Sequence, residues 1–135
     1  MKLRLKNTFV DSLSISAKEG LEKTEGLALQ FGCAFSEQSD DTFQVIFEMQ
    51  LNVEKAGSQT DRPSHLLDLK YIAVFELDDP ITQDFIEGLF PKVNAPAIAY
   101  PYMRSFIGTM LLNAGYDPVM LPSVNFQALA TSNAE

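Results

Sequence analysis

The chain has little of the chemistry that most enzymes and metalloproteins need. It contains one cysteine, Cys33, one histidine, His65, and no tryptophan among its 135 residues. A lone cysteine cannot form an internal disulfide, which excludes a disulfide framework and fits a reducing compartment. A structural zinc site takes about four cysteine, histidine or carboxylate ligands, more than this chain offers in one place. We expect no metal and no cofactor.

Long uncharged apolar runs are also absent. No run approaches the roughly 18 residues that indicate a membrane span. The start, Met-Lys-Leu-Arg-Leu-Lys, alternates charge with apolarity and does not lead into the apolar region of a signal peptide. Basic residues are few, with 10 Lys and Arg against 18 Asp and Glu, so the net charge is −8 and nucleic acid is disfavoured. We expect a cytoplasmic protein without direct membrane insertion.

Candidate catalytic groups are isolated from one another. Cys33 lies in the middle of an expected strand, which favours a buried small hydrophobe over a thiolate nucleophile. His65 lies at a loop-to-strand boundary, and the paired acids Asp40-Asp41 and Asp78-Asp79 lie at turns, where acids usually solvate loops or cap helices. No glycine-rich phosphate cradle follows a strand. The sequence predicts no enzyme.

What is present in the first half is apolar alternation with a period of two, which is typical of half-buried strands. It occurs in residues 3–6 and 12–16, as two short strands or one strand interrupted near Asn7, and then in residues 27–35, 42–54 and 66–77. Polar or glycine-bearing loops, 18–26, 36–41 and 55–64, separate them. Consecutive strands joined by loops this short predict an antiparallel sheet.

After Asp78-Asp79-Pro80 the apolar spacing becomes helical. A first helical segment carries Phe85 to Phe90, and an amphipathic helix runs from Pro96 to Gly115, with Pro101 expected to kink or loosen its first turns. Residues 117–122 read as extended, and 124–130 as one or two final helical turns. The length fits one domain, 1–135, of α+β class: a four-stranded antiparallel sheet with C-terminal helices packed on its apolar face.

Apolar side chains exceed what one subunit of this size hides. The helix is apolar nearly all round over two turns, from Ala97 to Met103. One side of such a helix can face the sheet, and the rest needs another cover. The pattern therefore favours a homo-oligomer over a well-packed monomer.

Two motifs resemble the SecB family of protein-export chaperones. The first is Asn94-Ala-Pro-Ala-Ile-Ala-Tyr-Pro-Tyr-Met-Arg104, and the second is Leu121-Pro-Ser-Val-Asn-Phe-Gln-Ala-Leu129. The turn and strand at Asp40-Asp41-Thr42-Phe43 are also similar. The resemblance covers residues 26–130, whereas the first 25 residues match in character alone.

The resemblance implies a homotetramer, a dimer of dimers with helices sandwiched between two outer sheets. It also implies an ATP-independent holdase that captures unfolded preproteins, keeps them export-competent and delivers them to the SecA motor. By position in the family, the client-binding apolar groove comprises Leu27, Leu29, Phe31, Ile98 and Tyr102. Leu66 and Asp68 occupy the places of a Leu-x-Glu pair on the family's SecA-docking face, with the acid one methylene shorter here.

The sequence departs from the family pattern at its end. The family continues after Leu129 with a longer helix and a polar tail that helps engage SecA, whereas this sequence stops at Glu135. The resemblance therefore supports client holding better than delivery to SecA. Two alternatives stay open: a SecB-like chaperone dedicated to a toxin–antitoxin pair or another specific client, and an oligomeric small-ligand-binding domain.

Overall fold

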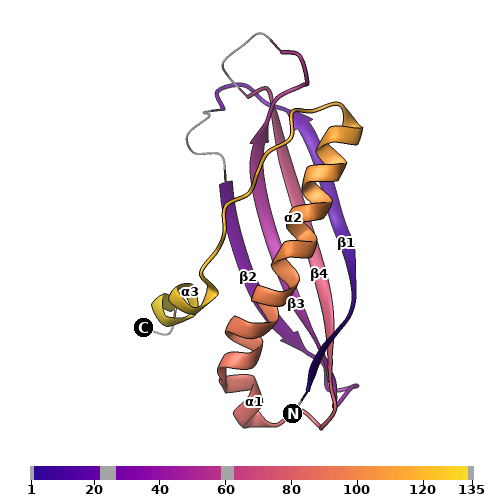
Figure 1. Cartoon of the computed structure of the whole chain (residues 1–135), viewed down its shortest axis with the longest axis vertical. Helices are drawn as coiled ribbons and strands as arrows, with labels where there is room; N and C mark the ends of the chain where they lie inside the picture. The colour runs from indigo at the N-terminus through magenta and orange to yellow at the C-terminus, as the bar shows by residue number, and fades with distance from the viewer. Residues whose placement is uncertain (1, 22–26, 59–62, 134–135) are drawn as a thin grey trace.

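The computed structural model describes residues 2–21, 27–58 and 63–133, with side chains described up to residue 129. Four strands precede the helices along the chain (Figure 1). The elements are β1 (Leu3–Ala17), β2 (Leu27–Phe35), β3 (Thr42–Val53), β4 (His65–Leu77), α1 (Gln83–Glu87), the π-helix η1 (Phe90–Asn94), α2 (Ala95–Ala114) and α3 (Phe126–Asn133). The predicted fold class is confirmed. The predicted loops 18–26 and 55–64 lie partly outside the described residues.

The four strands form one antiparallel sheet in the order β1-β4-β3-β2. Strands β2, β3 and β4 pair in sequence order, as short loops between antiparallel strands predict. Strand β1 differs, because it pairs with β4 and lies at the opposite edge from β2. Alternation and loop length predicted the antiparallel sheet but not this order of its strands.

Strand β1 is one strand of 15 residues and not two. Its register against β4 shifts between Leu5 and Asn7 and again between Val10 and Ser12. Each shift inserts one extra residue, which reverses the alternation of side chains between the two faces of the sheet. Leu13 and Ile15 consequently pair with Leu69 and Leu67 on the same face that Leu3 and Leu5 occupy.

The core lies on one face of the sheet, because the alternating apolar residues of β3 and β4 all point there. The opposite, outer face of these two strands carries polar side chains together with Ile46, Leu66, Ile72 and Val74. Buried side chains of the sheet face are Phe43, Val45, Phe47, Met49, Leu51, Val53, Leu67, Leu69, Tyr71, Ala73, Phe75 and Leu77. From α2 they are met by Ala95, Ala99, Tyr100, Met103, Ile107 and Leu111.

The helical half begins where Thr82 caps α1, its hydroxyl accepting a hydrogen bond of 3.1 Å from the Phe85 amide. Pro91 opens the π-helix η1, and α2 then continues through Pro101 without ending. Pro101 has no amide to bond the Ala97 carbonyl, and both residues are exposed, so water can reach this carbonyl. Gly115 ends α2 in the left-handed region, with φ of 91°.

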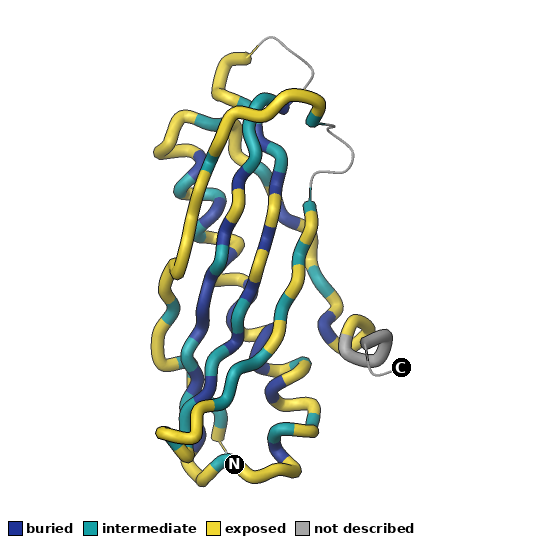
Figure 2. Tube along the Cα trace, turned by 180° about the vertical axis from the view of Figure 1, so that it is seen from behind, coloured by how far each residue is buried: buried dark blue, intermediate teal, exposed yellow. Residues whose placement is uncertain are grey.

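Two different segments cover the apolar face of the sheet (Figure 1). Helix α2 packs against β1, β4 and β3. The extended segment after it, residues 117–125, crosses toward β2 and leads to α3, which lies beyond the β2 edge in both views (Figures 1 and 2). We call residues 117–125 the strap. No described helix covers the outer face of the sheet (Figure 2).

Candidate binding groove

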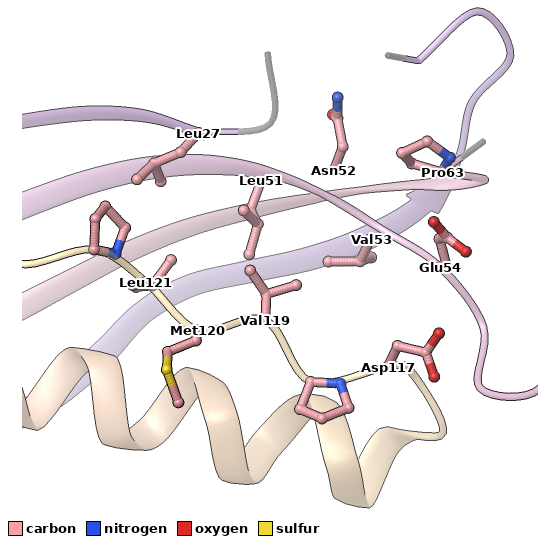
Figure 3. Close-up of a pocket in the computed structure, with 12 residues that line it drawn as sticks. Leu27, Leu51, Asn52, Val53, Glu54, Pro63, Asp117, Val119, Met120 and Leu121 are labelled. Carbon is pink, nitrogen blue, oxygen red and sulfur yellow. The ribbon is translucent and has the colours of Figure 1, made fainter. Parts of the chain in front are cut away.

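A groove lies between the strap and strands β2 and β3. Its volume is about 560 Å³. Leu27, Leu51 and Val53 line it from the strands, and Val119 and Leu121 face them from the strap (Figure 3). Pro118 and Pro122 keep the strap extended and remove two backbone donors, so it does not pair with the sheet as a strand would.

One end of this groove is acidic. The carboxylates of Glu54 and Asp117 lie there, where the strap leaves α2 (Figure 3). The start of the strap is joined here to the segment that follows β3. The Asp117 amide donates a hydrogen bond of 2.9 Å to the Glu54 carbonyl, and the backbones of Lys55 and Tyr116 pair in an isolated antiparallel β-bridge. A peptide lying in the groove would meet apolar walls and then negative charge.

Four aromatic rings meet where the strap passes into α3. Phe126 packs edge-on against Phe31, with ring centroids 5.0 Å apart, and against Tyr100 at 5.6 Å and Phe47 at 6.3 Å. The Tyr100 hydroxyl donates a hydrogen bond of 2.7 Å to the Pro122 carbonyl. Burial raises the pKa of Tyr100, with the Arg104 cation acting in the opposite direction, so this hydroxyl keeps its proton at neutral pH.

A second cavity separates the strap from α2. Its volume is about 920 Å³, and it is lined by Pro101, Arg104 and Gly108 of the helix. Met120 points to this side, away from the sheet, and is 94% exposed (Figure 3). The strap thus has open space on both of its sides, although Leu121 is buried in the core and Val119 and Val124 pack against it.

The structure places three of the five predicted groove residues on the strap side of β2. Leu27 lines the groove, Phe31 belongs to the aromatic cluster, and Leu29 lies between them, opposite Met49. All three are half-buried. Their predicted role in client binding stays a prediction, and the geometry brings them to one surface.

Ile98 and Tyr102 are not brought to that surface. They are 41% and 54% exposed, on the side of α2 opposite its buried residues Ala99, Met103 and Ile107. Residues four apart lie on one helix face, so Ile98 and Tyr102 form an outward apolar stripe. The sequence did not distinguish this stripe from the groove, because the helix is apolar on both sides.

Leu66 and Asp68 both lie on the outer face of β4, where Leu66 is half-buried and Asp68 is exposed. Asp68 borders a shallow depression of about 440 Å³ that extends across all four strands. Its polar lining is Ser12, Gln30, Glu48, Gln50, Asp68 and Lys70. Lys70 is paired with Asp11 at 3.6 Å, which leaves the acids Glu48 and Asp68 as the exposed charges of this depression.

The strap residues were not among the predicted site residues. The sequence carries a signal for them, since Val119 and Leu121 alternate with Met120 between Pro118 and Pro122. That pattern indicates an extended, half-buried segment. It does not indicate which part of the sheet the segment crosses, because this depends on where β2 lies.

The side chains of His65 and Cys33 each contact a residue of the helical half of the chain or of its end. The ring of His65 packs edge-on against Tyr116, with centroids 5.3 Å apart. The Cys33 thiol donates to the Pro91 carbonyl at 2.8 Å, and burial raises the pKa of this thiol to about 11. Within residues 2–21, 27–58 and 63–133, no three His, Cys, Asp or Glu side chains are grouped to hold a metal ion, and no helix is long and apolar enough to cross a membrane.

Comparison with known families defines the class of this protein. The family described as preprotein translocase subunit SecB matches residues 1–135. The chain therefore belongs to the SecB family, as the two sequence motifs indicated.

Curated relatives named protein-export protein SecB are similar to this chain at modest sequence identity. The protein of Anaplasma marginale is 32% identical over 92 residues, which are 68% of this chain and 50% of the relative. That of Rickettsia felis is 25% identical over 114 residues, covering 84% of this chain and 72% of the relative. The match thus spans about half the length of the first of these relatives.

A solved structure confirms the fold. It is the SecB-like chaperone Rv1957 of Mycobacterium tuberculosis, in complex with a ChAD peptide from the Rv1956 HigA1 antitoxin. The superposition covers 90% of each chain with a TM-score of 0.63 at 14% sequence identity. At this identity the likeness concerns the fold alone.

Proposed function

We propose that this protein is an ATP-independent chaperone that holds unfolded polypeptides in the groove beneath the strap. The observation that carries the proposal is the groove itself, in which apolar residues of β2, β3 and the strap face a common space of about 560 Å³. Unfolded chains expose apolar side chains, and each 100 Å² removed from water contributes roughly 2.5 kcal/mol before the chain is ordered. Ordering offsets much of this gain, so binding at one groove is weak and reversible.

Several grooves on one oligomer strengthen such binding, because the second contact of a long client is intramolecular. The outward stripe of α2, with Ile98 and Tyr102, supports assembly through this helix. Strand β1 adds a free edge with three exposed apolar residues, Phe9, Val10 and Leu13. We assign both surfaces to contacts between copies of this chain, in the dimer of dimers that the family resemblance implies.

For clients destined for export, the proposed delivery partner is the SecA motor. The outer face of the sheet, with Leu66, Asp68 and the exposed acid Glu48, supports docking of a basic partner. Such a chaperone acts in the cytoplasm, before its clients cross the membrane.

The test measures binding of a fluorescein-labelled, slowly folding preprotein by anisotropy, together with suppression of its aggregation, both without nucleotide. Leu27→Ser removes one apolar wall of the groove and should weaken binding by roughly five- to tenfold. Leu89→Ser is the matched control, because Leu89 is 59% exposed and does not line the groove. Absence of binding at molar excess of the wild-type protein would contradict the proposal.

A second candidate keeps the groove and changes the client. The fold matches a SecB-like chaperone solved with a peptide from an antitoxin, which favours a single dedicated client as the alternative. The two readings differ in selectivity. A general holdase binds several unrelated denatured preproteins with similar affinity, whereas a dedicated chaperone binds one natural client at least about a hundredfold more tightly than the others.

A further inference from the structure

An apolar row crosses all four strands on the outer face of the sheet. The register places Phe9 of β1 opposite Ile72 of β4, Ile72 opposite Ile46 of β3, and Ile46 opposite Gly32 of β2. Residues paired in this way have their side chains on the same face. Phe9 is 39% exposed and Ile46 is half-buried, and no described helix covers them (Figure 2). We call these four residues the outer row.

The outer row is low enough for another flat surface to approach it closely. Ile72 is only 6% exposed, because Phe9 and Ile46 flank it on the neighbouring strands. At the β2 end of the row, a Cβ added to Gly32 would meet nothing within 4 Å. Two sheets that pack face to face lie about 10 Å apart, a spacing that bulky outward side chains would prevent.

One side of the outer row carries an excess of positive charge. Glu76 follows Ile72 by four positions on β4, which is about 13 Å along the strand. Its carboxylate is contacted by Arg4 at 2.6 Å and by Lys6 at 3.8 Å. The side chains of these two cations are 70% and 56% exposed. Two cations share one carboxylate, so this side of the row is positive.

The other side of the outer row carries an excess of negative charge. Asp68 precedes Ile72 by the same four positions on β4, and it is exposed, as is Glu48 on β3. The cation between them, Lys70, is already paired with Asp11 at 3.6 Å. The two charged regions therefore lie at equal distances from the row and have opposite signs.

We propose that the outer face binds the outer face of a second copy of this chain, with a two-fold axis that runs along the outer row. Rotation about this axis places row against row and brings Asp68 of each copy beside Arg4 and Lys6 of the other. A two-fold interface uses one patch twice, so the patch must be complementary to itself. The opposite charges about Ile72 meet this condition.

This contact has a consequence for any partner of the outer face. Stacked copies cover Asp68 and Glu48, the acids to which we assign docking of a basic partner. At high concentration the free protein would therefore withhold this face until a partner displaces the second copy. Stacking requires neither client nor motor, so its failure would leave the proposed function standing, and failure of client binding would leave stacking standing.

Sedimentation velocity of the full chain, without client, tests the contact. The face of one small sheet gives an interface at the weak end of the known range, so we expect association at roughly 10 to 500 µM. The mass of the main species should double with concentration, and salt should suppress this step because exposed charges contribute to it. No doubling across this range at low salt would overturn the proposal.

Two charge reversals test the predicted pairing of residues. Asp68→Arg and Arg4→Asp each place like charges opposite one another, so each should weaken stacking at least about tenfold. One substitution makes the chain less negative and the other makes it more negative, so overall charge cannot explain a loss common to both. Asp84→Arg on α1 is the control for Asp68→Arg and should stack like the wild type.

A mixture of the two variants gives the sharpest result. In a pair formed by one Asp68→Arg copy and one Arg4→Asp copy, both contacts again join opposite charges, so stacking should return to within about threefold of the wild type. A mixture that stays unstacked would overturn the proposed axis.

A third variant tests the row independently of the charges. Gly32→Arg places a long side chain where the face is open, and it should abolish stacking without changing the mass of the species at low concentration. Stacking by Gly32→Arg at wild-type strength would exclude the outer row from the contact.

Discussion

The hydroxyl of Tyr71 donates a hydrogen bond of 2.9 Å to Oγ1 of Thr8, which joins strand β4 to the edge strand β1. Tyr71 is 5% exposed, and its ring stacks on Phe106 of α2 with centroids 5.8 Å apart. This bond lies between the two register shifts of β1, at Leu5/Asn7 and Val10/Ser12. It therefore holds the strand where the backbone pairing is least regular.

Tyr71→Phe should lower the free energy of unfolding by about 1 kcal/mol, because a partly buried hydrogen bond is lost and the Thr8 hydroxyl is left without this partner. Chemical denaturation at a fixed protein concentration measures this change. Ser123→Ala, which removes an exposed hydroxyl from the strap, should stay within about 0.5 kcal/mol of the wild type. Equal destabilisation by both variants would mean that the Tyr71–Thr8 bond contributes nothing specific.

Cys33 should influence stability at alkaline pH. Burial raises the pKa of its thiol from 9.0 to about 11, against the weaker effect of the Lys92 cation. The unfolded chain therefore loses this proton first, and the contribution of Cys33 to stability, complete below pH 9, falls as the pH rises toward 11. Tyr100, whose pKa burial also raises, acts in the same direction, so the comparison must be made with Cys33→Ala. The variant should lose less stability than the wild type between pH 8 and 10.5 in urea titrations. Parallel curves would contradict the assigned pKa.

The outward stripe of α2 should govern assembly. Ile98→Asp combined with Tyr102→Asp places charges in the contact proposed between subunits. It should raise the concentration for assembly by roughly a hundredfold, because burying an unpaired charge costs a few kcal/mol. Light scattering after size exclusion measures the mass of the species. Ala97→Asp is the control, since residue 97 is exposed but lies about 100° around the helix from residue 98.

A different result with this pair would restore the original expectation for the two residues. If the oligomer persists and binding of denatured clients is lost, Ile98 and Tyr102 belong to the client surface and not to the subunit contact. If both assembly and binding persist, neither role holds.

The outer face of the sheet should determine binding to the motor. Asp68→Lys reverses one of the exposed charges beside the depression on β4, and it should weaken binding to purified SecA by roughly three- to tenfold, more at low salt than at high salt. Asp84→Lys makes the same change of charge on α1. Surface plasmon resonance at two salt concentrations compares them. An equal loss in both variants would indicate that overall charge acts, and not this face.

The sequence predicted local structure correctly wherever one face of a strand or helix is apolar and the other is polar. The alternation from Phe43 to Val53 predicted β3 and its buried face, and Gly115 predicted the end of α2. The groove was not readable, because it joins Leu27 to Val119 and Leu121, which are separated by some ninety positions in the chain. Which strand the strap crosses depends on the order of the strands, and alternation within each strand carries no information about that order.

The two sides of α2 were not separable for a related reason. Ala99 and Met103 are buried, whereas Ile98 and Tyr102 are exposed, although all four are apolar or aromatic. Hydrophobicity distinguishes a buried face from an exposed one only when the exposed face is polar. In this helix both faces are covered in the oligomer that we propose, so the periodic signal is weak.

The position of β1 beside β4 has a consequence for synthesis of the chain. Leu3 pairs with Leu77, so the first strand made finds its neighbour only after the last strand has been made. Until then β2 and β3 can pair with each other, whereas the N-terminal segment has no strand to pair with. Sheet closure over such a sequence separation slows folding. While it is being synthesised, a chaperone of this topology therefore has an incomplete sheet until β4 has been made, and its first strand stays unpaired.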